Sequence, residues 1–159
     1  MEFMLNIKDL ADYIITKLCE GGEELNNLKL QKLAFYCDAW YLAFFGKKLV
    51  DTDFQAWIHG PVSRELYDRF SATKSLYSSI AIEDRSPDYQ MNLSINDAAH
   101  IDSVLEAYGK FSGAQLEEMT HREEPWIRAR KGYRPSQRCE EVLDSAVTRD
   151  YYKSRLSQA

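Results

Sequence analysis

One stretch decides the fold: residues 28–46, which read LKLQKLAFYCDAWYLAFFG. Its polar residues are few, and the apolar and aromatic side chains between them cover nearly the whole circumference of a helix. A helix that is apolar on every side is either a membrane span or the centre of a domain. Lysines in the first turn and Asp38 in the middle disfavour a span, so we expect a central helix that ends at Gly46. Its expected core residues are Leu33, Tyr36 and Trp40.

Further helices are predicted by apolar side chains that recur every three or four residues and by residues typical of helix ends. Asn6 suits the N-cap of the first helix, and Ser112 has capping-box spacing. Pro125 suits the first turn of another helix, and Ser136 suits the cap of the last. The expected helical segments are residues 7–18, 63–70, 98–108, 112–119, 126–131 and 139–147.

Short strands are expected in two places. Residues 54–58 show strand-like alternation and include Trp57, a further expected core residue, before the chain turns. Residues 76–82 and 89–95 flank a polar loop and predict a small hairpin. The chain has no internal repeat, low-complexity run or linker. The prediction for residues 1–159 is therefore mainly α: a single compact helical domain around one central hydrophobic helix, with a small β-hairpin or short strands inserted.

Composition narrows the class of protein. With 159 residues, 45% of them hydrophobic and 13% aromatic, the chain can bury a core, which excludes intrinsic disorder. A net charge of −5 disfavours nucleic acid as the partner of the whole molecule. Cys19, Cys37 and Cys139 are odd in number and widely spaced, as is typical of reduced thiols. The N-terminus lacks the pattern of a signal peptide, so we expect a cytoplasmic chain without a membrane span.

No catalytic motif is legible. His59, His100 and His121 have no metal-ligand spacing, and the chain lacks a nucleophile elbow, a Walker A loop and a dinucleotide fingerprint. The cysteines lie on or beside apolar faces, which favours buried thiols over nucleophiles. We therefore expect no enzyme, no metal and no cofactor.

A local excess of positive charge lies in residues 122–138, with six bases against Glu123 and Glu124. We favour the interpretation that these bases pair with acids of the same domain. The alternative is a nucleic-acid-binding module in which the bases contact phosphates and Trp126 or Tyr133 stacks on bases.

Three ordered blocks together resemble a known family. They are residues 28–46, residues 54–62, which read FQAWIHGPV, and residues 120–130, which read THREEPWIRAR. The order and content resemble the Panacea domain, a family that includes SocA-like antitoxins and GepA-like phage-associated proteins. The resemblance covers nearly the whole chain.

The resemblance implies an antitoxin that neutralises a cognate toxin by direct protein–protein binding. In the SocA-like branch it further implies an adaptor that delivers the toxin to an ATP-dependent protease. Many members carry an additional DNA-binding domain, for which this chain has no room. The alternatives that remain are a prophage-associated interaction or regulatory protein without a toxin partner, and the nucleic-acid-binding module. The oligomeric state is left open.

The expected partner-binding surface lies where the second and third blocks carry unusual residues. It comprises His59, Gly60, Pro61, Thr120, His121, Glu123, Glu124 and Trp126. Aromatic residues such as tryptophan dominate binding hot spots, and an acidic domain can steer a basic partner. The same residues could instead serve folding, with Gly60-Pro61 forming a turn and Trp126 packing in the core.

Overall fold

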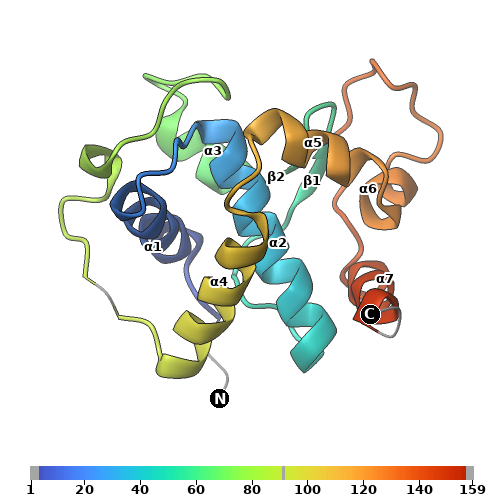
Figure 1. The fold of residues 1–159 in the computed structure, drawn as a ribbon. Helices are drawn as coiled ribbons and strands as arrows, with labels where there is room; N and C mark the ends of the chain where they lie inside the picture. The colour runs from blue at the N-terminus through green and yellow to red at the C-terminus, as the bar shows by residue number, and fades with distance from the viewer. Residues whose placement is uncertain (1–3, 91, 157–159) are drawn as a thin grey trace.

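The computed structural model describes residues 4–90 and 92–156. Within these residues the chain forms seven α-helices, one 3-10 helix and a two-stranded antiparallel sheet (Figure 1), which confirms the predicted mainly α class. The elements are α1 (Ile7–Glu20), α2 (Asn27–Phe45), β1 (Gln55–Trp57), β2 (Gly60–Val62), α3 (Arg64–Phe70), η1 (Ile82–Asp84), α4 (Ile95–Tyr108), α5 (Gly113–His121), α6 (Glu124–Ala129) and α7 (Ser145–Leu156). No helix of this part of the chain is long and apolar enough to cross a membrane.

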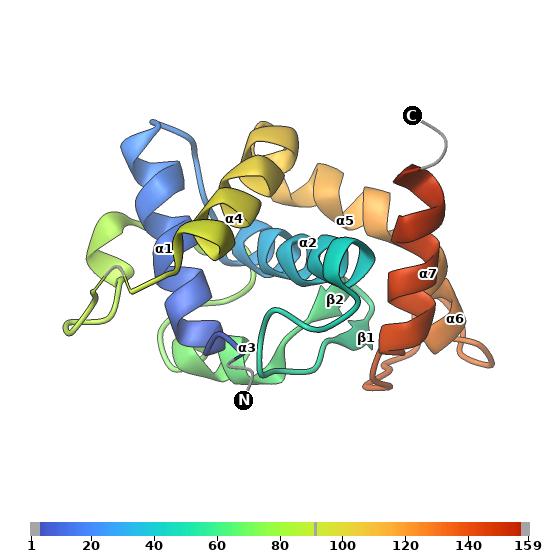
Figure 2. The same ribbon diagram turned by 90° about the horizontal axis from the view of Figure 1, so that it is seen from below.

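Helix α2 is the centre of the molecule, as its sequence predicts. Figure 2 shows it running across the middle, with α4 and α5 on one side and the hairpin and α3 on the other. Leu33 and Tyr36 are fully buried, whereas Trp40 is half-buried and packs against the core. The helix ends at Gly46, whose φ of 75° lies in the left-handed region that glycine adopts without strain.

The residues predicted at helix starts are confirmed at three positions. The side chain of Asn6 accepts a hydrogen bond from the backbone of Lys8 at the start of α1. Ser63, the first residue of a predicted helical segment, caps α3. Ser112 and Gln115 form the predicted capping box of α5, and Pro125 lies in the first turn of α6.

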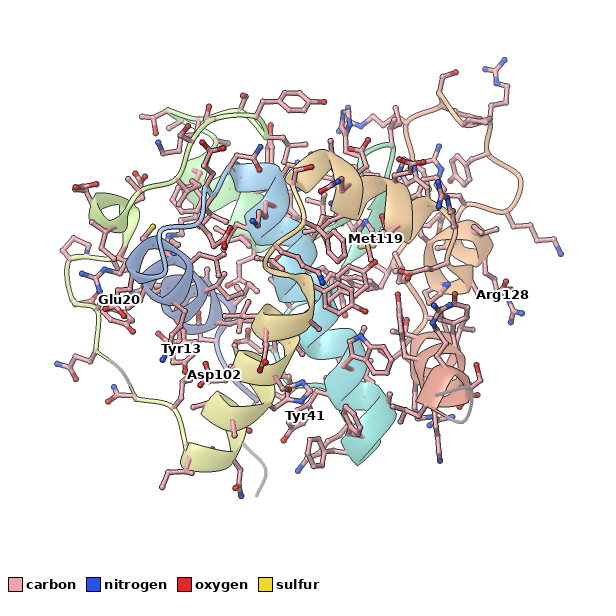
Figure 3. The ribbon with its side chains drawn as sticks, in the orientation of Figure 1. Tyr13, Glu20, Tyr41, Asp102, Met119 and Arg128 are labelled. Atoms are coloured by element: carbon pink, nitrogen blue, oxygen red, sulfur yellow. The ribbon has the colours of Figure 1, made fainter. Side chains whose placement is uncertain are left out.

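Helices α1 and α4 are joined by a short hydrogen bond. The hydroxyl of Tyr13 donates to Asp102 Oδ1 at 2.6 Å, and Figure 3 labels both side chains. Because the bond links two helices that both pack on α2, it holds one side of the core together.

The predicted strand at residues 54–58 is confirmed as β1, which pairs with β2. Ala56 lies opposite Pro61, and Trp57 lies opposite Gly60. A later segment continues the pairing on the other side of β1, because Ala56 N donates to Glu141 O at 2.8 Å and Leu143 N donates to Phe54 O at 2.8 Å.

The predicted helix over residues 139–147, capped by Ser136, is wrong over residues 139–144. Residues 141–143 run beside β1, and the helix begins only at Ser145. Cys139 and Leu143 are four residues apart and both buried, which produced the helical pattern. Backbone hydrogen bonds to β1 hold this segment extended, and Val142 between them is half exposed.

The predicted hairpin of residues 76–82 and 89–95 is also wrong. Residues 76–80 contact the first turn of α2 and the connection before it instead: Leu28 N donates to Leu76 O at 2.7 Å, and Ile80 N donates to Leu25 O at 2.9 Å. Element η1 follows, and the described residues 89, 90 and 92–94 carry no strand, with Met91 outside the described residues. Leu76 and Ile80 are buried by these contacts, and such tertiary contacts override strand propensity.

Candidate functional site

The three sequence blocks meet in space. Helix α2 supplies one wall, the β1–β2 hairpin lies against it, and the corner between α5 and α6 closes the other side (Figure 1). We call this region the motif junction. It contains all the predicted partner-binding residues together with Lys32, Tyr36 and Trp57, which touch them.

At the centre of the motif junction, Lys32 fits under the hairpin turn. The side chain is fully buried, and its Nζ donates to the carbonyl oxygen of Pro61 at 2.8 Å. Gly60 has a φ of 98°, and a Cβ there would lie 2.6 Å from Lys32 Cε and 2.8 Å from Thr120 Oγ1. Only glycine lets the hairpin approach both side chains this closely.

The charge of Lys32 is costly in this position. Burial lowers the pKa of Lys32 to about 7, and the nearby carboxylate of Glu117 acts against the shift. A buried ammonium needs acceptors that replace water, and the carbonyl oxygen of Pro61 is one of them. Lys32 therefore links α2 to the hairpin, although burial disfavours its charged form.

A second buried polar cluster surrounds Glu123. One carboxylate oxygen of Glu123 accepts hydrogen bonds from the hydroxyls of Tyr36 and Tyr152, both at 2.7 Å. Burial raises the pKa of Glu123, and the two hydroxyl donors act against that rise. Burial and the neighbouring carboxylate raise the pKa of both tyrosines, so their hydroxyls stay protonated and donate.

The aromatic rings around this carboxylate form a continuous layer. Tyr36 stacks on Tyr108 with ring centroids 4.1 Å apart, and Trp40 Nε1 donates to the hydroxyl of Tyr108 at 2.8 Å. The layer connects α2, α4, α6 and α7 through one buried acid, because Glu123 lies directly before α6.

Trp126 attaches the α5–α6 corner to the hairpin. Its indole nitrogen donates to the carbonyl oxygen of Trp57 at 2.8 Å, and the ring of His121 stacks on it at 4.1 Å. Burial lowers the pKa of His121, so this ring is neutral at pH 7. Trp126 and His121 are half-buried, with part of each side chain at the surface.

Arg130 is a member of the junction that the sequence did not single out. It is 5% exposed, and its guanidinium donates to Ala56 O at 2.8 Å and to Arg134 O at 2.8 Å. Its position within a basic stretch indicated a solvated side chain. In the structure it instead joins the hairpin to the loop after α6 by donating to their backbone carbonyl oxygens. It also lies 5.2 Å over the Trp126 ring, close enough for a cation–π contact.

The predicted partner-binding residues thus separate into an inner and an outer group. The inner, buried group is Gly60, Pro61, Thr120 and Glu123. The outer, half-buried group is His59, His121, Glu124 and Trp126. The hairpin turns at Ile58 and His59, so Gly60 and Pro61 do not form the predicted turn but begin β2. Trp126 packs against the core, as the alternative interpretation expects. Contact of either group with a partner stays a prediction.

The outer group borders an aromatic surface that the sequence did not predict. Trp57, expected in the core, is instead half-buried on this surface, as is Tyr67, and their ring centroids lie 5.0 Å apart. The Arg64 guanidinium lies 4.7 Å over the Trp57 ring. Together with His59 and Glu140 they line a hollow of about 290 Å³. We call this surface, with His59 and Trp126 at its edge, the hairpin face.

Most bases of the residue 122–138 stretch have partners inside the domain. Arg122 pairs with Glu118, Arg128 with Glu124 at 3.0 Å, and Arg138 with Glu140 at 3.2 Å. Arg130 is buried against backbone carbonyls. Three of the six bases therefore pair with acids of the same domain, as the favoured interpretation expects, whereas Arg130 departs from it.

The three cysteines lie in the core or pack against it. Cys37 and Cys139 are buried and Cys19 is half-buried, and all three are free. Burial raises the pKa of Cys37. In the part of the chain that the structure describes, no three His, Cys, Asp or Glu residues lie close enough to share a metal ion.

Fold and junction define a small, mainly α domain whose central helix carries charged and polar groups into the core. Over residues 30–127 the chain matches the family described as "Antitoxin SocA-like, Panacea domain", and it belongs to that family. The matched span contains both the inner and the outer group of the motif junction.

A named relative also carries the description of an antitoxin. The chain is 28% identical over 128 residues to "Antitoxin SocA" from Caulobacter vibrioides (strain NA1000 / CB15N). The alignment covers 74% of this chain and 65% of that protein, so the chain spans a little under two thirds of the relative's length. No solved structure matches the chain.

Proposed function

We propose that this chain is a cytoplasmic antitoxin that neutralises a cognate toxin by direct protein–protein contact and acts without catalysing a reaction. The observation that carries the proposal is membership of the SocA-like Panacea family over residues 30–127. The named relative, which is itself an antitoxin, supports the same function.

The hairpin face is the surface that we propose meets the toxin. It presents Trp57, Tyr67 and Arg64, residue types that dominate binding hot spots, beside the outer residues His59 and Trp126. The buried Lys32 and Glu123 clusters hold the backbone beneath this surface in place, so the face is ordered before the toxin arrives.

A more specific form of the proposal adds proteolysis. In this form the bound toxin is delivered to an ATP-dependent protease, and the chain is an adaptor rather than a simple blocker. Both forms use the same contact with the toxin and differ only in the fate of the bound toxin.

Co-expression with the product of the neighbouring gene tests the proposal. We expect that product to arrest growth alone and growth to recover when this chain is present. Recovery with a stable co-purified complex indicates blocking, whereas recovery with loss of the neighbour protein indicates delivery to a protease. A harmless neighbour, or one that this chain neither binds nor removes, would overturn the antitoxin proposal in favour of a prophage-associated protein without a toxin partner.

Two matched variants test the surface. Glu124→Lys changes a half-buried acid of the outer group, and Glu118→Lys changes an acid outside that group. Both acids pair with an arginine four residues later in the chain, so both substitutions break the same kind of exposed ion pair. We expect Glu124→Lys alone to weaken toxin binding at unchanged melting temperature. Equal affinities of the two variants would remove Glu124 from the proposed contact.

A further inference from the structure

A second hollow lies outside the motif junction. Three segments build it: residues 19–26 between α1 and α2, residues 77–83 around η1, and residues 110–115 between α4 and α5. Its volume is about 1070 Å³. We call it the acid-rimmed groove. Glu20, labelled in Figure 3, lies at its edge at the end of α1.

Backbone contacts preform the walls of the groove. Ile80 N donates to Leu25 O at 2.9 Å, which joins the first two segments. Lys29 Nζ donates to Gly109 O at 2.6 Å and to Glu24 O at 3.2 Å, which joins α2 to the turn after α4. A groove whose walls are already joined does not lose much conformational entropy when a ligand binds.

One part of the groove floor is apolar. Leu25 and Ile80 are 6% and 4% exposed and lie beneath it, Ile82 is half-buried, and Ala81 is exposed. Tyr77 stands at one edge with 64% of its surface exposed. Aliphatic side chains of a bound segment would find apolar contacts here.

The rim carries the opposite character. Glu20, Glu23, Glu24 and Glu83 are all exposed, and within residues 4–90 and 92–156 no ion pair joins any of them to a base. Other exposed acids behave differently, since Glu118 and Glu140 pair with arginines. The one exposed base among the lining residues is Lys110, so the rim has a net negative charge.

The groove is continuous with the hairpin face. The hydroxyl of Tyr77 lies 3.4 Å from His59 Nδ1, and the two rings meet edge to face with centroids 5.9 Å apart. A partner on the hairpin face would therefore reach the groove by passing over Tyr77.

We propose that the acid-rimmed groove docks a segment of the toxin that carries both lysine or arginine and aliphatic side chains. The inference rests on the proposed function, because the toxin is the partner that we propose for the adjoining hairpin face. The aliphatic side chains of the segment lie on the apolar floor, and its basic side chains pair with the carboxylates of the rim. Such charge complementarity accelerates association and selects the partner.

A labelled peptide of alternating leucine and lysine tests the groove without the toxin. The test variant is Glu23→Gln/Glu24→Gln/Glu83→Gln. The matched control is Glu65→Gln/Asp68→Asn/Glu106→Gln, which neutralises the same number of exposed acids outside the groove. Binding is followed by fluorescence anisotropy, and folding of each variant by circular dichroism and melting temperature.

We expect the wild-type chain to bind the leucine–lysine peptide and not a leucine–glutamate peptide. The groove variant is expected to bind about tenfold more weakly and with a smaller dependence on salt, and the control to change by less than about twofold. Failure of the wild-type chain to bind the leucine–lysine peptide, or equal losses in the two variants, would overturn the proposal.

The same variants in the growth-rescue assay separate this inference from the antitoxin proposal. Rescue that the groove variant loses and the control retains supports toxin docking in the groove. If the groove variant still rescues growth and binds the toxin with full affinity, the docking proposal is overturned while the antitoxin proposal stands. If the wild-type chain itself does not rescue, the antitoxin proposal fails and the toxin as occupant of the groove fails with it, whatever the peptide shows.

Discussion

Replacing Gly60 by alanine should destabilise the protein through two separable effects. The first is backbone strain, since a φ of 98° is unfavourable for a residue with a Cβ by about 1–2 kcal/mol. The second is overpacking, since the new Cβ would lie 2.6 Å from Lys32 Cε and 2.8 Å from Thr120 Oγ1, a clash whose relief costs about 1–3 kcal/mol. We expect a total loss of about 2–5 kcal/mol in the free energy of unfolding, measured by urea denaturation with tryptophan fluorescence.

Gly132→Ala is the matched control. Gly132 has a φ of 92°, close to that of Gly60, but a Cβ there would meet nothing within 4 Å. Its replacement should therefore cost only the backbone strain, about 1–2 kcal/mol. The difference between the variants measures how tightly the hairpin is packed on Lys32 and Thr120. Equal losses in the two variants would refute the tight junction that we describe.

Three further predictions concern the buried polar groups. Burial lowers the pKa of Lys32 to about 7, so above that pH the unfolded chain binds more protons than the folded one. The free energy of unfolding of the wild type should therefore rise, relative to that of Lys32→Met, from about pH 7 towards pH 10. Urea titrations should show a rise of at most ~1.4 kcal/mol per pH unit. Glu123→Ala leaves two buried hydroxyls without their acceptor and should cost about 2–4 kcal/mol, whereas Glu124→Ala should stay within about 1 kcal/mol in the same assay; comparable losses would contradict the inner and outer assignment. Cys19, which is half-buried, should react with a thiol reagent in the native protein well before Cys37, and a reversed order would show that the core around Cys37 opens.

The sequence predicted the elements whose signals are local. Asn6, Ser112 and Pro125 act within their own turn, and the apolar run of α2 needs no partner to be recognised. The last segment misled the prediction because Cys139 and Leu143 have helical spacing. Residues 141–143 are instead held beside β1 by hydrogen bonds to residues more than eighty positions earlier in the chain, which local spacing does not encode.

The candidate site was predictable in its members more than in their roles. The sequence blocks brought Gly60, Thr120 and Trp126 into one hypothesis, and the structure does place them together. Nothing in the sequence indicated that Lys32 and Arg130 are buried, because a charged side chain is expected at the surface unless a distant acceptor is known. Their acceptors are backbone carbonyls of the hairpin, which carry no sequence signature.

Residues of the inner and outer groups alternate along one short segment, residues 120–124. The toxin affinity of a variant in this segment must therefore be compared with its melting temperature. Thr120 and Glu123 point into the core, while His121 and Glu124 directly follow them in the chain and reach the surface. A substitution at an inner position therefore destabilises the motif junction and displaces the outer side chains. Any loss of partner binding that it causes is indirect. A change at a true contact residue alters affinity while the melting temperature stays the same. Loss of toxin binding at Thr120 or Glu123 is consequently no evidence of contact unless the variant is as stable as the wild-type chain.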